Sequence, residues 1–330
     1  MKIVDWKVAD DKKNIRDGAI ELRASVSENL YVKLFETPEK AKFQVKNDRT
    51  FWRRKCIEKL ELLNSSPISG KILEIGAGSG WCSALLSKKS EINHIDVLDY
   101  DKYSVTELMP LVFKNLDANT AKLTGVIGSY NDIKAEDNHY DYIISVGAIH
   151  HSENLDETFK ECERVLKPGG FLIAIEHCHP NSYTKQQEIN DNESLLSAER
   201  VKNLYGDANL KIKAKDNSDH NYRISEFEAS AYKAGLNILP YIFEKGGEDA
   251  DDDIFKNPKP YRGFTNRTFK PYFAKNNLAP VFDNLLVICQ KTAVADSSIF
   301  KDINASPVKV GTKRTFLQKA TAKIKRMLFS

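Results

Sequence analysis

The feature that most constrains the fold of this 330-residue chain is an alternation of short apolar runs and stretches with helical spacing. Five strand-like runs follow one another through its middle: 71–76, 92–98, 123–128, 141–147 and 171–176. The segments between them carry apolar residues at helical spacing: 81–89, 101–117 and 156–166. Such alternation predicts βαβ units and a parallel sheet. Two further strands are predicted later in the chain, at 236–243 and 284–290.

A glycine cluster, LEIGAGSG (73–80), lies between the first predicted strand and the first helix. Open α/β sheets bind ligands at the carboxyl ends of their strands, and glycines there let the backbone approach a ligand. Trp81 occupies the third glycine position of a dinucleotide fingerprint, and no Lys-Ser/Thr pair of a P-loop follows. The cluster therefore predicts a different cofactor site, and the alternative is an ordinary tight turn.

An acidic residue, Asp99, ends the second predicted strand, 19 residues after Gly80. A carboxylate at this place can accept hydrogen bonds from both hydroxyls of a ribose. The alternative is that Asp99 only caps the following helix, a role that we expect for Asp101.

Four segments together show a resemblance to a known family: LEIGAGSG, HIDVLDYD, YDYIISVGAIHH and FKECERVLKPGGFLIAIE. They resemble the class I S-adenosylmethionine-dependent methyltransferases, in particular the group with an RVLKPGG element. The resemblance covers 68–178 well and 225–292 loosely. It implies a Rossmann-like, doubly wound α/β sheet of seven strands with the last strand antiparallel. It also implies methyl transfer from a sulfonium to a nucleophile.

The resemblance places the cofactor site residue by residue. Glu74 would orient the loop and face the methionine amino group through water, and Asp99 would bind the ribose hydroxyls. Tyr100 would stack on the adenine, and Ser129 and Tyr130 would border it, although the family usually has an acid at position 129. Four residues would contact the methionine and ribose through their backbone: Gly76, Ala77, Gly78 and Gly80. Gly147 would lie near the methyl donor.

Histidine has the unperturbed pKa that suits a base removing a proton from an alcohol acceptor. Candidate catalytic histidines follow predicted strands or lie in a later segment: His150, His151, His177, His179 and His220. For each one, the alternative is a hydrogen-bonded structural histidine. A metal site from Glu176, His177 and His179 is conceivable, but no carboxylate cluster completes it, and we predict no metal.

The predicted domain organisation is an N-terminal helical cap (1–67), a methyltransferase domain (68–295) and a basic tail (296–330). Two insertions, 177–224 and 244–280, are predicted to cap the substrate. The second is rich in aromatic and basic residues, which suits a sugar or glycan-related hydroxyl acceptor. The alternatives are N-methylation of a small metabolite and a non-catalytic cofactor-binding module.

The net charge of +3 divides unevenly along the chain. Residues 303–330 carry seven basic and no acidic residues, and the other 302 residues carry 42 basic and 46 acidic ones. The acidic body predicts no nucleic-acid partner. Residues 312–329 have an apolar stripe among lysines and arginines, which predicts peripheral contact with the inner membrane surface; the alternative is a solvated tail. Scattered cysteines, the absence of a signal-like N-terminus and the absence of a long apolar run favour a cytoplasmic protein.

Overall fold

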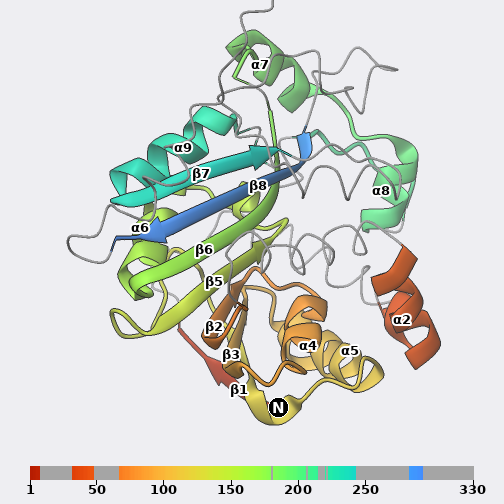
Figure 1. The fold of residues 1–330 in the computed structure, drawn as a ribbon. Coiled ribbons are helices and arrows are strands. Elements are labelled where there is room, and N and C mark those ends of the chain that lie inside the picture. Colours follow the sequence, from red (N-terminus) through yellow and green to blue (C-terminus); the bar gives the residue numbers. More distant parts are fainter. Residues whose placement is uncertain are drawn as a thin grey trace, which may run out of the picture. The chain divides into compact units, whose positions relative to one another are not determined.

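The structure is a computed structural model that describes residues 1–7, 32–47, 67–179, 181–205, 207–214, 220, 222–242 and 282–292. All of them lie in one compact unit, Met1–Thr292 (Figure 1). The second unit, residues 293–330, lies outside the described residues. The predicted insertion 244–280 and most of the predicted N-terminal cap also lie outside them.

One eight-stranded sheet, in the order β1-β4-β3-β2-β5-β6-β8-β7, organises the unit. Its strands are β1 (Lys2–Asp5), β2 (Gly70–Ile75), β3 (Ile92–Asp99), β4 (Leu123–Ile127), β5 (Tyr140–Val146), β6 (Leu166–Cys178), β7 (Leu236–Ile242) and β8 (Phe282–Lys291). The first six strands of this order, from β1 to β6, pair in parallel with their neighbours. Strand β8 runs antiparallel to both β6 and β7. All seven predicted strands are confirmed, including the antiparallel last strand.

The expectation of seven strands was wrong by one, because the N-terminus adds β1 beside β4. This edge strand has only four residues, and three of them are exposed, so it shows no apolar pattern that could predict it. Helix α2 (Pro38–Asn47) is the described helical part of the predicted cap. Helix α2 packs on α5 (Met109–Asn115). The Asn115 side-chain amide donates to the carbonyl of Phe35, which lies just before α2 in the chain (2.6 Å).

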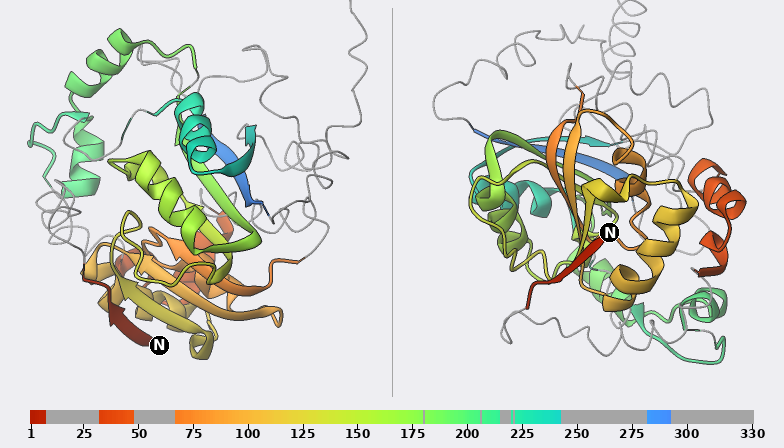
Figure 2. Two further views of the ribbon diagram at one scale, coloured as in Figure 1. Left: turned by 90° about the vertical axis from the view of Figure 1, so that its left-hand side faces the viewer. Right: turned by 90° about the horizontal axis from the view of Figure 1, so that it is seen from below.

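Helices cover both faces of the sheet (Figure 2). On one face α4 (Trp81–Leu86) and α5 contribute Trp81 and Phe113 to a core with Ile72 of β2. On the other face α6 (Leu155–Val165) and α9 (Ile224–Lys233) pack Phe159 and Phe227 with Leu73. Neighbouring residues of β2 thus enter different cores, as the pleat of a doubly covered strand requires.

The remaining described helices are shorter or lie beyond β6. They are η2 (Ser104–Leu108, a π-helix), η3 (Thr120–Lys122), η4 (Ile149–His151), α7 (Lys185–Glu193) and α8 (Ala198–Tyr205). Because β2, β3, β4, β5 and β6 run parallel, their carboxyl ends lie at the same edge of the sheet. The predicted site residues follow these strand ends.

Candidate active site

The glycine loop after β2 has a left-handed backbone at Gly76, Gly78 and Gly80, with φ of 60°, 54° and 70°. A Cβ at Gly76 would collide with the Cβ of Ala148, and one at Gly80 would lie 2.7 Å from Phe113 Cε1. No described atom lies within 4 Å of a Cβ added at Gly78. The loop is therefore tightly packed at both ends and open in its middle, where a ligand can approach the backbone.

Asp99, at the end of β3, connects the glycine loop to the next helix. Its Oδ2 accepts from the Gly78 amide (2.6 Å) and its Oδ1 from the Asp101 amide (2.8 Å). Burial raises the pKa of this carboxyl to about 6, although hydrogen bonds to backbone amides oppose that shift. Asp101 accepts from the Ser104 amide (3.1 Å) and hydroxyl (2.6 Å), which confirms its predicted capping role. Binding of the ribose by Asp99 stays a prediction.

Glu74 lies in β2, is only 2% exposed and faces the first turn of α4. Its Oε2 accepts from the Ser83 amide (2.9 Å) and from the Ser83 hydroxyl. Burial raises the pKa of Glu74 to about 7, because these hydrogen bonds only partly offset the loss of solvation. The carboxyl thus fixes the start of α4 directly behind the glycine loop.

The loops after β4 and β5 meet beside Gly76. The Tyr130 hydroxyl donates to the Ala148 carbonyl (3.2 Å), and the Tyr130 ring lies 3.7 Å from a Cβ built on Gly76. Gly147 has φ of 67° and donates to the Ile175 carbonyl (2.7 Å). Ser129 stabilises its own turn, since its hydroxyl accepts from the Asn131 amide (3.1 Å). Tyr100, half-buried, directly follows Asp99. The predicted cofactor residues therefore gather along adjacent strand ends.

Glu176, near the end of β6, is a residue whose role sequence reasoning missed. It is 1% exposed, as is His150. Its carboxylate accepts hydrogen bonds from four residues around the end of β5: Ser145 Oγ (2.7 Å), Ala148 N (3.1 Å), Ile149 N (2.9 Å) and His150 Nδ1 (2.8 Å). An acid within the apolar run FLIAIE was the only sequence signal, and it suggested just a metal ligand.

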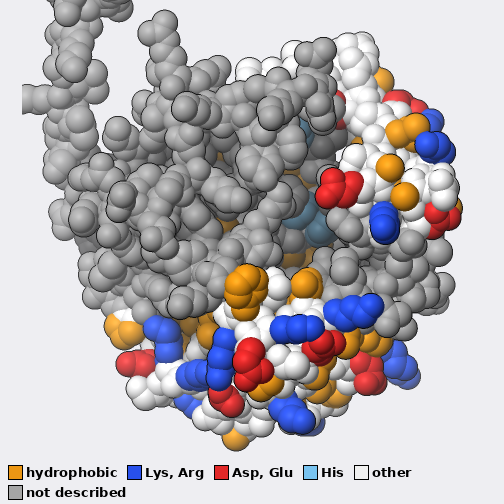
Figure 3. Space-filling model, turned by 90° about the vertical axis from the view of Figure 1, so that its right-hand side faces the viewer, with side chains coloured by type: hydrophobic (Ala, Val, Ile, Leu, Met, Phe, Trp, Pro, Cys, Tyr) orange, Lys and Arg blue, Asp and Glu red, His pale blue; other side chains and the backbone are white. Residues whose placement is uncertain are grey.

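Three of the five candidate histidines come together next to Gly147. The rings of His150 and His151 are 4.0 Å apart between centroids, and the His220 amide donates to the His150 carbonyl (3.1 Å). His150 is buried, whereas His151 and His220 are half-buried. Figure 3 shows histidine side chains, in pale blue, recessed in one face of the molecule.

The other two candidates, His177 and His179, lie at the end of β6 and directly after it. His179 is buried and stacks on Tyr183, with centroids 3.8 Å apart. The His177 side chain lies outside the described residues. Among the described residues no group of three or more histidine, cysteine, aspartate or glutamate side chains could hold a metal ion.

These geometries agree with the comparison to known families. The sequence profile of the family described as a methyltransferase domain matches residues 73–174. That segment runs from β2, through the glycine loop and Asp99, into β6. The chain carries a class I S-adenosylmethionine-dependent methyltransferase domain. The predicted cofactor residues lie in or after β2, β3, β4 and β5, and the loops after these strands contact one another through Gly78, Asp99, Tyr130 and Ala148.

Curated relatives match the methyltransferase domain over part of their length. The squalestatin hexaketide synthase of Phoma sp. is 32% identical over 121 residues, which are 34% of this chain and 5% of that protein. The ubiquinone/menaquinone biosynthesis C-methyltransferase UbiE of Shewanella sp. (strain ANA-3) is 25% identical over 189 residues, 52% of this chain and 68% of that protein.

Among solved structures, a phosphoethanolamine N-methyltransferase 2 of Haemonchus contortus aligns with a TM-score of 0.48 at 15% identity. The alignment covers 82% of this chain and 60% of that one.

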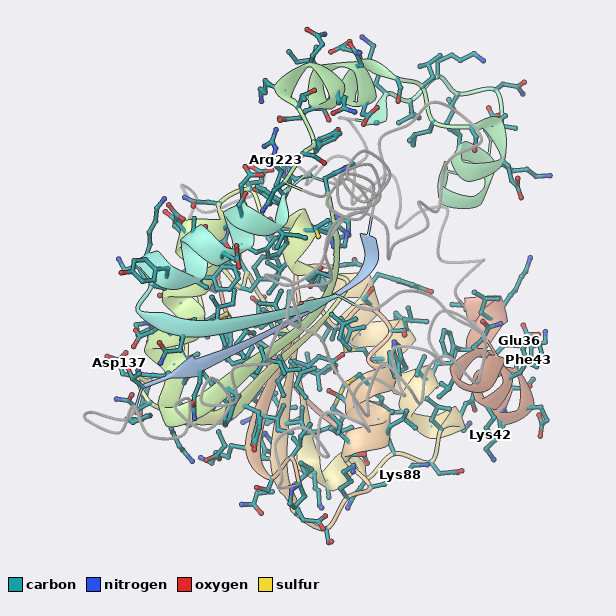
Figure 4. The ribbon with its side chains drawn as sticks, turned by 45° about the horizontal axis from the view of Figure 1, so that its top comes forward. Glu36, Lys42, Phe43, Lys88, Asp137 and Arg223 are labelled. Carbon is teal, nitrogen blue, oxygen red and sulfur yellow. The ribbon has the colours of Figure 1, made fainter. Side chains whose placement is uncertain are left out.

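The predicted insertion 177–224 contains Arg223, at the start of α9 (Figure 4). The Arg223 guanidinium donates to the Tyr183 carbonyl (2.7 Å) and to Glu188 Oε2 (3.1 Å) in α7. The Tyr222 hydroxyl donates to the Ser152 carbonyl (2.7 Å) after η4. The end of this insertion is therefore tied to the histidine-bearing loop. Whether it covers the acceptor stays a prediction.

Proposed function

We propose that the protein transfers a methyl group from S-adenosylmethionine to a hydroxyl of a small acceptor, in particular a sugar or glycan-related one. The observation that carries this proposal is the ring contact between His150 and His151 just after β5, together with the backbone hydrogen bond from His220 to His150. An alcohol must lose its proton as it attacks a methyl carbon, and a neighbouring imidazole can accept that proton. The sugar preference rests on the aromatic and basic residues of the sequence 256–277.

When bound, S-adenosylmethionine would supply an activated methyl group on a sulfonium, with S-adenosylhomocysteine as the product. The glycine loop and Asp99 bind and orient the cofactor. Tyr130 closes one side of the site, because its hydroxyl donates a hydrogen bond to the Ala148 carbonyl. His151 accepts the acceptor's hydroxyl proton, because it lies in the histidine cluster and is less buried than His150. The alignment of nucleophile and methyl group supplies most of the rate, as in other in-line displacements.

The test is S-adenosylhomocysteine release across a panel of acceptors, with cofactor binding measured separately by calorimetry. The panel holds sugar hydroxyls, small amines and an activated carbon acid, since one relative is named a C-methyltransferase. We expect S-adenosylmethionine to bind, NAD not to bind, and turnover with a hydroxyl acceptor. Turnover only with amines or carbon acids would contradict O-methylation. Cofactor binding without any turnover would indicate a binding module instead.

We propose further that the basic tail attaches the protein weakly to anionic membranes. No helix within the described part of the chain is long and apolar enough to cross a bilayer. The tail sequence combines seven basic residues with an apolar stripe, and each basic residue near an anionic leaflet contributes about 1 kcal/mol. We expect the full chain to sediment with phosphatidylserine-containing liposomes and a chain lacking 303–330 to stay in the supernatant. Phosphatidylcholine liposomes serve as the control, and equal sedimentation of the two forms with anionic liposomes would contradict the proposal.

A further inference from the structure

The Glu176 carboxylate fills a pocket of hydrogen-bond donors formed by the turn after β5. Its Oε1 accepts from Ser145 Oγ, Ala148 N and Ile149 N, and its Oε2 accepts from His150 Nδ1 at 2.8 Å and, more distantly, from His150 N at 3.4 Å. The backbone amides can only donate, and the Ser145 hydroxyl and His150 Nδ1 can both donate, so the pocket suits a group that accepts at both oxygens. Glu176 is 1% exposed, so these bonds replace solvent almost completely.

This arrangement joins two neighbouring strands across the site. Ser145 lies in β5, residues 147–150 form the turn after it, and Glu176 comes from β6. Gly147 lies within the same turn and donates to Ile175, the residue before Glu176. The position of the turn therefore depends on a side chain 26 to 31 residues further along the chain.

The bond to Glu176 also determines which ring nitrogen of His150 carries a proton. When Nδ1 donates to a carboxylate, a neutral imidazole must leave Nε2 unprotonated. The His150 ring lies against the His151 ring, with centroids 4.0 Å apart and planes at 42°. A change in the orientation of His150 would thus displace His151.

The geometry points to Glu176 as a positioning residue of the active site. It holds the turn that carries Gly147, fixes the Nδ1–H tautomer of His150 and, through the ring contact, orients His151. The catalytic part of this inference rests on the proposed methyl transfer. The structural part concerns only the Glu176–His150 pair, and a separate measurement tests it.

The decisive variant is Glu176→Gln. Its amide oxygen can keep the bonds to Ser145, Ala148 and Ile149, while its amide NH₂ group faces His150 Nδ1 and demands an acceptor there. The matched control is Glu163→Gln on α6, whose carboxylate pairs with Lys291 (3.1 Å) away from the turn. We expect Glu176→Gln to lower kcat at least about 10-fold, with cofactor Kd changed less than about 3-fold, because a wrong tautomer impairs chemistry more than binding. Glu163→Gln should match the wild type in both.

The tautomer itself is read from ¹H–¹⁵N long-range correlation spectra of histidine-labelled protein, with the His150 signals assigned by a His150→Gln variant. We expect the wild-type His150 pattern to show protonated Nδ1 and the Glu176→Gln pattern to show protonated Nε2. An unchanged pattern would overturn the assignment to Glu176, whatever acceptor the protein uses. A changed pattern with unchanged kcat would overturn its role in catalysis. If no acceptor is turned over by the wild type, the proposed function fails, but the spectra still decide the Glu176–His150 pairing.

Discussion

The two halves of the site are held in different ways, as their buried glutamates show. In the half built from β2 and β3, Glu74 is 2% exposed and accepts hydrogen bonds from Ser83, at its amide and hydroxyl. In the half built from β5 and β6, Glu176 is equally buried but accepts from four different residues. Burial raises the pKa of Glu74 to about 7.

This difference teaches that a buried carboxylate can serve a site in two ways. Glu74 fixes the start of α4, but burial disfavours its charged form, so that its protonation changes near neutral pH. Glu176 organises a whole turn, because many donors converge on it. The two halves touch where Gly76 packs against Ala148, whose amide is bound by Glu176. A substitution at this contact should change the geometry of both halves, and a substitution elsewhere in the site should change only one of them.

The largest effect is expected for Gly76→Ala, at the contact between the halves. A methyl group there combines a left-handed φ of 60° with a collision against Ala148 Cβ. Left-handed strain and overpacking together cost the folded state about 3 kcal/mol or more, and displacement of the loop to relieve this strain should lower cofactor affinity by up to about 100-fold. Calorimetric titration with S-adenosylmethionine measures this loss.

The matched control for Gly76→Ala is Gly169→Ala. Gly169 also has a positive φ (81°), but no described atom lies within 4 Å of a Cβ added there. This variant should show only the backbone strain, about 1 kcal/mol in the free energy of unfolding, with unchanged cofactor affinity. If both variants bind the cofactor equally well, the halves do not depend on this contact.

An effect on one half alone is expected for His151→Ala, in the half built from β5 and β6. Losing a general base lowers kcat about 100-fold, whereas the cofactor Kd should change less than about 3-fold. His139→Ala is the control, because His139 precedes β5 at the opposite end of the strand and packs edge-on against Tyr140. A His151→Ala variant with wild-type kcat would exclude His151 and shift the role to His220 or His177.

A third effect concerns Glu74, in the half built from β2 and β3; it is an effect on stability and depends on pH. The pKa of Glu74 is raised from 4.5 to about 7 by burial, so the folded state binds its proton more tightly than the unfolded state does. The stability contribution is therefore fully present below pH 4.5 and is lost as pH rises through 7. Glu74→Gln removes this loss and should stabilise the protein by up to about 3 kcal/mol at pH 8, with little difference near pH 4.5.

Urea unfolding at the two pH values measures this difference. Glu163→Gln again serves as the control, because its carboxylate is partly exposed and paired with Lys291. A Glu74→Gln variant whose stability relative to the wild type did not change with pH would show that Glu74 stays in one protonation state in the folded protein.

The fold was largely predictable because its signals are local. Strand runs, helical spacing and the glycine cluster each occupy a few consecutive residues, and the structure confirms all seven predicted strands. The eighth strand, β1, was missed because four mostly exposed residues at a sheet edge carry no periodic pattern. The capping role of Asp101 was predictable because such a partner is local, and Ser104 lies only three residues away.

What the sequence by itself determined is therefore the parallel sheet, the glycine loop at its carboxyl edge and the type of cofactor that such a loop serves. It could not distinguish His150 from His151, which are adjacent and chemically identical. The tertiary structure decided this, because the carboxylate that buries and pairs His150 arrives from β6, 26 residues away. Sequence neighbours have different burial and different hydrogen-bond partners when the group that separates them comes from another strand.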